Sequence, residues 1–217
     1  MSIIRYVIAI ALLFIIYPNY SHARSKSHIG VVSIINNIVS AEENNKERIL
    51  TNADKIYPGQ FIKTLLNSKV QILFKDQTII NIGPDTEMLI ESYIDTQQNT
   101  KFLISLSRGV VRFQSGTLPS ESYEIKSPIA VVKIKGTEVD LLVSRSGGTE
   151  VVLRNGLATV IPSSGRPQAI TPTSQPNDAL ILRDKNTFLR LTSDGPSTTK
   201  PQAFKSGRGD FYEQEIK

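Results

Sequence analysis

Apolar and polar side chains alternate along most of residues 30–161, with the two-residue period of a half-buried β-strand. The clearest example is residues 123–143 (YEIKSPIAVVKIKGTEVDLLV), which predict three strands interrupted at Ser127-Pro128 and at Gly136-Thr137. An isolated glycine within a strand pattern is typical of a bulge or of a close approach between backbones. Gly136 is therefore predicted to have a structural role rather than to belong to a ligand loop.

The same alternation predicts further strands at residues 30–35, 70–74, 80–82, 88–90 and 102–113. Pro58 and Gly59 predict a turn, because proline presets one φ angle and glycine accepts the positive φ that follows. The polar run at residues 40–48 is instead interpreted as a solvated loop.

No segment after the first 23 residues has the period of a helix, and short strands separated by turn signals predict an all-β fold. The architectures that fit are a two-sheet β-sandwich or roll and a short β-solenoid. A faint repeat, LSRGVVRFQSG at 106–116 and LRNGLATVIPSSG at 153–165, favours layered strands.

The C-terminal region has a different composition, because six of the 11 prolines follow Ile161. This predicts a Pro-rich extension with a linker at residues 166–178 and a flexible tail at residues 193–217. Residues 179–192 are a candidate for a hairpin that docks on the domain, with its turn at Asp184-Lys185-Asn186. The all-β domain itself is assigned to residues 24–165.

The N-terminus has the features of a signal peptide. Arg5 precedes an apolar run at residues 6–17, and Ser21-His22-Ala23 supplies small residues at the two positions that a signal peptidase reads. The run is shorter than the roughly 20 residues needed to span a bilayer. Cleavage after Ala23 is therefore predicted, giving a periplasmic or secreted protein with no stable membrane span. An uncleaved inner-membrane anchor is the alternative.

Composition argues against catalysis. The chain has no cysteine and no tryptophan, and its two histidines, His22 and His28, lie in the signal peptide and close to the mature N-terminus. The sequence therefore supplies almost no residues for a catalytic triad, a thiolate nucleophile or a histidine metal site. Glu138 and Asp140 share a strand face and are interpreted as its solvated side. We expect no catalytic residues, no metal and no cofactor.

The net charge of +5 is too small to predict nucleic-acid binding.

Four further segments, in order with residues 123–143, carry a family likeness: YPGQFIKT at 57–64, the hairpin pattern at 70–89, LSRGVV at 106–111 and LRNGLATV at 153–160. Together they resemble the FecR domain over residues 29–161. The residues that carry this signature are Gly59, Gly109, Pro128, Gly136, Thr137 and Gly156. Gln60 departs from the usual Asp. Asp76-Gln77 replaces the usual Asp-Gly, so the hairpin turn there is predicted to change type or lengthen.

The resemblance implies a periplasmic β domain that acts through interactions. The best-known FecR regulators relay a signal from an outer-membrane receptor through a membrane helix to a sigma factor, using a cytoplasmic region before the helix. Here the apolar segment begins near Ile3. We therefore expect a stand-alone, exported FecR-domain protein and do not expect anti-sigma activity.

Two functions follow as hypotheses. The first is a periplasmic or envelope-associated binding module for an envelope protein or an anionic envelope polymer. Its candidate face consists of five cations: Arg108, Arg112, Lys126, Lys133 and Lys135. The competing interpretation of each cation is an ordinary solvated or edge-strand residue. The second hypothesis is a signalling partner in a FecR-type trans-envelope system that docks by strand addition.

Overall fold

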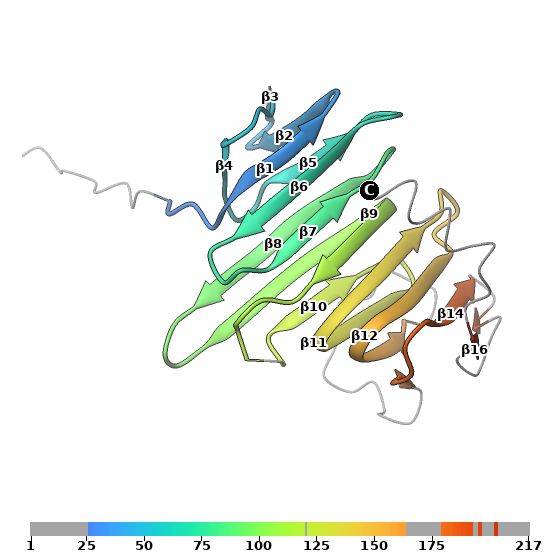
Figure 1. Cartoon of the computed structure of the whole chain (residues 1–217). Helices are drawn as coiled ribbons and strands as arrows, with labels where there is room; N and C mark the ends of the chain where they lie inside the picture. The colour runs from blue at the N-terminus through green and yellow to red at the C-terminus, as the bar shows by residue number, and fades with distance from the viewer. Residues whose placement is uncertain (1–25, 120, 164–178, 193–194, 197–201, 204–217) are drawn as a thin grey trace, which may run out of the picture.

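The computed structural model describes residues 26–119, 121–163, 179–192, 195–196 and 202–203, and every regular element among them is a β-strand (Figure 1). The predicted all-β class is therefore confirmed. The predictions for the signal peptide and the linker lie outside the described residues. The strands are β1 (Gly30–Asn36), β2 (Val39–Glu43), β3 (Lys46–Ile49), β4 (Lys55–Ile56), β5 (Phe61–Thr64), β6 (Lys69–Phe74), β7 (Ile79–Ile82), β8 (Glu87–Asp95), β9 (Thr100–Gln114), β10 (Tyr123–Lys126), β11 (Ala130–Val143), β12 (Thr149–Pro162), β13 (Leu180–Leu182), β14 (Thr187–Thr192), β15 (Gly195–Pro196) and β16 (Gln202–Ala203).

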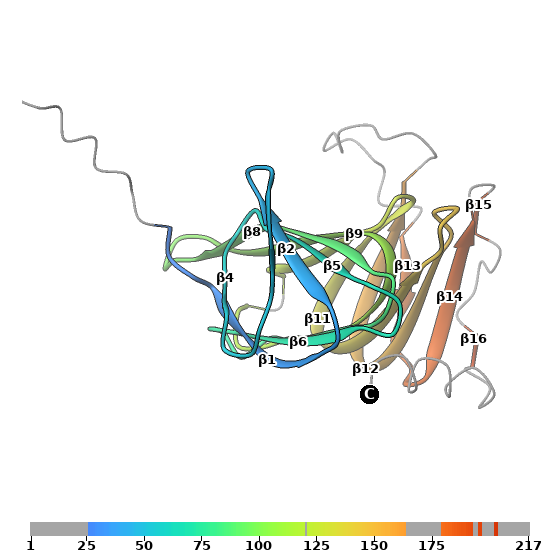
Figure 2. The same cartoon turned by 90° about the horizontal axis from the view of Figure 1, so that it is seen from above.

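Backbone hydrogen bonds join these strands into one mixed sheet that folds back on itself, as the view from above shows (Figure 2). The long strands β9, β11 and β12 hold the two layers together because their halves have different neighbours. The first half of β9 pairs with β8 and, in parallel, with β10, whereas its second half pairs with β7 and β11. Apolar side chains from both layers meet in one continuous core.

Each long strand bends at a signature glycine with positive φ: Gly109 in β9 (99°), Gly136 in β11 (58°) and Gly156 in β12 (90°). An extra residue at such a bulge shifts the alternation of side chains by one position. In β9, for example, the positions that join the main core change from even numbers to odd numbers across Gly109: Phe102, Ile104 and Leu106, then Val111 and Phe113. The shift keeps apolar side chains on the core side while the strand turns.

The remaining signature residues also lie in turns and bends. Gly59 has a φ of 82°, and its N–H donates to the Ile90 carbonyl at 2.7 Å. Pro128 lies in the turn between β10 and β11. Buried Thr137 bridges β11 and β12, because its Oγ1 lies 2.8 Å from the Leu157 carbonyl oxygen and accepts the Leu157 N–H at 3.1 Å.

The β6–β7 turn, which was predicted to change type or lengthen, contains a residue with positive φ. Gln77 takes the position of the usual glycine with a φ of 68°. Neighbouring Asp76 is buried, and its Oδ2 accepts the hydroxyls of Thr78 at 2.6 Å and Tyr123 at 2.8 Å. Burial, together with this carboxylate, raises the pKa of Tyr123 to about 12. The contacts of Asp76 with Thr78 and Tyr123 hold the hairpin turn against β10.

Two predictions about local structure are wrong. The polar run at residues 40–48 is the β2–β3 hairpin rather than a loop. Residues 179–192 do not form a hairpin, because β13 pairs with the second half of β12 and β14 with its first half. These residues instead follow the bend of β12 as a broken strand, and they place Leu182, Leu189 and Leu191 in the core. Within the predicted tail, β15 and β16 pair with β14.

Candidate interaction surfaces

The five predicted binding cations do not form one patch. Arg108 and Arg112 lie at the bend and in the second half of β9, whereas Lys126 lies on β10 and Lys133 and Lys135 lie on the first half of β11. The two groups also differ in pairing. Arg108, Arg112 and Lys126 each form an ion pair, while Lys133 and Lys135 are exposed and have no ion pair within the described residues.

Arg112 belongs to a compact charged cluster on the second half of the long strands. Its Nε and Nη2 donate to the two carboxylate oxygens of Asp140 at 2.7 and 2.9 Å. Arg154 Nε donates to the same carboxylate at 2.8 Å, and Glu138 lies 3.5 Å from Arg112 Nε. The Asp140 side chain is 0% exposed, so its assignment to the solvated side of the strand is wrong. Two arginines from neighbouring strands cover it.

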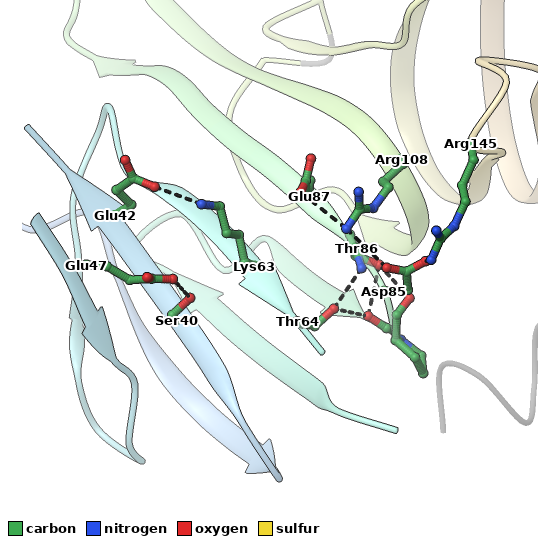
Figure 3. A network of polar contacts seen from close by, with 12 residues as sticks. Ser40, Glu42, Glu47, Lys63, Thr64, Asp85, Thr86, Glu87, Arg108 and Arg145 are labelled. Atoms are coloured by element: carbon green, nitrogen blue, oxygen red, sulfur yellow. Dashed lines mark hydrogen bonds and ion pairs between the residues drawn. The ribbon is translucent and has the colours of Figure 1, made fainter. Parts of the chain in front are cut away.

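Arg108 belongs to a second ion-paired group, which Figure 3 shows from close by. Its Nη2 lies 3.1 Å from Asp85 and 3.2 Å from Glu87. Arg145, from the turn between β11 and β12, donates to the other Asp85 oxygen at 2.7 Å. Asp85 has a φ of 49°, so its αL backbone directs the carboxylate between the two arginines. Asp85 and Arg145 were not identified from the sequence, because neither stands in a distinctive motif.

Thr86 fixes this group to the fold. Its hydroxyl lies 2.9 Å from the Gly83 carbonyl oxygen and accepts the Val110 N–H at 3.0 Å, and its own N–H donates to Thr64 Oγ1 at 2.9 Å. The same view shows Lys63 bonded to Glu42 at 2.8 Å on the adjoining strands (Figure 3). The hydrogen bond to Glu42 raises the pKa of Lys63. The acidic partners therefore neutralise most cations on this part of the surface.

The lysine side of β10 and β11 is different. Lys126 Nζ donates to Glu91 at 2.9 Å, and Glu91 also accepts a short hydrogen bond from Ser105. Although burial opposes it, these hydrogen bonds lower the pKa of the Glu91 carboxyl. Lys133 lies opposite Glu124 in the sheet register but forms no ion pair with it. Lys133 and Lys135 thus project from one strand face into solvent.

The described residues show neither a helix that could cross a membrane nor a group of three or more metal-ligating acidic or histidine side chains. What the geometry defines is an all-β module whose surface chemistry is charge pairing and exposed lysines. Comparison with known sequences finds one family match. Residues 60–159 are similar to the FecR family, described as FecR protein, so the predicted resemblance is confirmed over this segment. No curated protein matches the sequence.

Two crystal structures of a "putative anti-sigma factor" from Parabacteroides distasonis ATCC 8503 have a similar fold, with TM-scores of 0.52 and 0.51. Sequence identity is 15% in both comparisons, and the matches cover 71% of this chain and 64% of the other protein. This chain therefore matches less than two thirds of that protein's length. At such low identity the likeness shows the fold.

Proposed function

We propose that this chain is an exported, non-catalytic FecR-domain protein that acts as a binding module in the periplasm or cell envelope. The observation that carries the proposal is the pair of exposed lysines, Lys133 and Lys135, on the first half of β11, neither of which has an ion pair among the described residues. Two residues along a strand correspond to roughly 7 Å, so both ammonium groups face the same way at a spacing that a polyanion can bridge. The proposed ligand is an anionic envelope polymer or an acidic surface of an envelope protein.

The core supports this position for the lysines. Val132 and Ile134 alternate with them and are buried, so β11 cannot rotate the lysines inward without exposing its apolar side. Export is proposed from the apolar run at residues 6–17 and the Ser21-His22-Ala23 site. N-terminal sequencing of the protein from the envelope fraction should then begin at or near Arg24, and a sequence that begins at Met1 would contradict cleavage.

Binding of the purified protein to a soluble polyanion such as dextran sulfate, and to isolated cell-wall sacculi, tests the surface. Lys133→Glu with Lys135→Glu should weaken both interactions by about tenfold or more, since two charge-assisted contacts become repulsive. The matched control is Lys46→Glu with Lys75→Glu, which changes the net charge equally at exposed lysines elsewhere. Wild-type binding should weaken at high salt. An equal loss of affinity in both double variants would mean that binding depends only on the net charge, and would contradict the proposed surface.

A second candidate function is that of a signalling partner that docks by strand addition, and one observation favours it. Beyond Val32, β1 pairs with β6 on one side but has no strand partner on the other within the described residues. This free stretch has no charged residue, unlike the edge strand β3, and Ile34 is 54% exposed. Binding that survives high salt but is abolished by Ile34→Lys would favour this function. Binding that disappears at high salt would favour the lysine surface.

A further inference from the structure

A small depression lies where three turns of the chain meet, away from the lysine surface. The Pro84-Asp85 turn, the Arg108-Gly109 bend and the turn after Val143 border an open depression with a volume of about 190 Å³. Its walls include the apolar side chains of Pro84, Val110 and Leu142. Val110 and Leu142 are opposite each other in the register of β9 and β11, and with Val152 and Phe188 they form an apolar cluster separate from the main core. The depression therefore has an apolar floor.

The rim of the depression is cationic on two sides. Arg108 and Arg145 both line it, and both are held by the single carboxylate of Asp85. A guanidinium has five N–H donors, and one carboxylate cannot satisfy two such groups. Glu87 supplies Arg108 with a further acceptor at 3.2 Å from Nη2. The rim therefore retains donor capacity for an additional anion.

One donor of Arg108 has no acceptor in the part of the chain that the structure describes. Its Nε is buried and has no hydrogen-bond partner within the described residues. A buried donor left without a partner costs about 1 to 3 kcal/mol, so native structures rarely keep one without a ligand, water or function that explains it. An incoming oxygen acceptor would remove this cost.

Arg145 is placed to close over such an acceptor. Its side chain is 75% exposed, and its only ion pair within the described residues is the one with Asp85. The residue lies in a turn that contains Gly147, which has a φ of 86°. Reorientation of this guanidinium from Asp85 to a ligand breaks no contact with the core.

We propose that this depression binds a small carboxylate that carries a short aliphatic chain. The carboxylate would receive hydrogen bonds from Arg108 and Arg145, and the chain would lie against Pro84, Val110 and Leu142. The volume of the open depression equals that of about six water molecules, which suits a chain of roughly five to seven carbons but not a large ligand. The site uses none of the lysines of the proposed binding surface, so either proposal can fail alone.

Titration of the purified, isotopically labelled protein with hexanoate, followed by NMR, tests this site. Hexanoate should shift the methyl signals of Val110 and Leu142 in a saturable manner. Hexanol, which lacks the charge, and acetate, which lacks the chain, should each bind at least about tenfold more weakly. Equal binding of hexanol and hexanoate, or no saturable shift with hexanoate, would overturn the proposal.

Two arginine variants localise the effect. Arg145→Gln should weaken hexanoate binding by about tenfold without changing the fold, because the side chain is exposed, and Arg145→Lys should restore part of the loss. Arg108→Gln should abolish binding if it folds. The matched control is Lys135→Gln, which removes one exposed cation elsewhere and should bind hexanoate as the wild type does. Unchanged affinity in Arg145→Gln would refute the role of the two arginines.

Discussion

The two halves of β11 present two differently constructed surfaces. In the second half, Asp140 is fully buried beneath Arg112 and Arg154, which come from the neighbouring strands β9 and β12. In the first half, Lys133 and Lys135 extend into solvent without an ion pair in the described structure. The backbone pairing is similar in both halves, since each lies between two strands. The difference lies in whether neighbouring strands supply opposite charges within reach.

This contrast separates charges that stabilise the fold from charges that are available to a partner. An arginine whose donors are already used by a buried carboxylate gains little from an external anion and costs stability when it is removed. An exposed lysine contributes little to folding and keeps its capacity to bind. Substitutions in the two halves should therefore have opposite consequences for stability and binding.

The largest expected effect is at Gly109, where β9 enters the paired half. A Cβ at this position would lie 2.2 Å from Thr86 Oγ1 and 2.4 Å from Thr86 Cα, and the φ of 99° is unfavourable for any side chain. Gly109→Ala should therefore lower the free energy of unfolding by about 4 kcal/mol or more. Chemical denaturation of the purified protein measures this loss. A change below about 1 kcal/mol would mean that the bend relaxes freely.

The next largest effect is expected for Asp140→Asn. The change removes the buried carboxylate charge that the largely covered Arg112 and Arg154 share, at a cost of about 3 kcal/mol. Glu124→Gln is the control on the open half, because Glu124 lies opposite Lys133 without forming an ion pair. It should change the free energy of unfolding by no more than about 0.5 kcal/mol. Similar losses in the two variants would remove the distinction between the halves.

A smaller effect is expected for Gly136→Ala, at the end of the lysine half. No atom lies within 4 Å of a Cβ built at this position, so only the φ of 58° opposes a side chain. The cost should be about 1 to 2 kcal/mol, and Gly136→Asn should cost less because asparagine tolerates the left-handed region. Thermal melts of these variants and of Gly109→Ala compare two sites. At Gly136 a side chain meets backbone strain alone, whereas at Gly109 it also clashes with Thr86. A Gly136→Ala loss as large as that of Gly109→Ala would contradict this comparison.

The fold was largely predictable from local pattern. Alternation placed strands in residues 123–143 and marked Gly136, because a two-residue period and a missing Cβ are properties of the sequence itself. It predicted three strands where the structure has two, since β11 continues through the bulge at Gly136. The β2–β3 hairpin was missed because its exposed strand β3 has no apolar alternation to reveal it. The path of residues 179–192 was missed because it depends on the bend of a distant strand, β12.

The candidate surfaces were less predictable, and the reason is spatial. Arg112 and Lys133 look alike in the sequence, since each is a cation on a strand with apolar neighbours. Only the strand order brings Asp140 and Arg154 to Arg112 while leaving Lys133 beside an unengaged Glu124. Arg145 reaches Asp85 across 60 positions of the chain, and no local motif encodes such a contact.

The most direct test of the account measures melting temperature and dextran sulfate affinity side by side for two variants. Lys133→Gln with Lys135→Gln should keep the wild-type melting temperature and lose about tenfold in affinity. Arg112→Gln should melt several degrees lower, since it leaves Asp140 with one arginine fewer, and should keep the wild-type affinity at a temperature where it is folded. If Arg112→Gln lost as much affinity as the lysine variant, or if the lysine variant melted as low as Arg112→Gln, the division of β11 into a structural half and a binding half would be wrong.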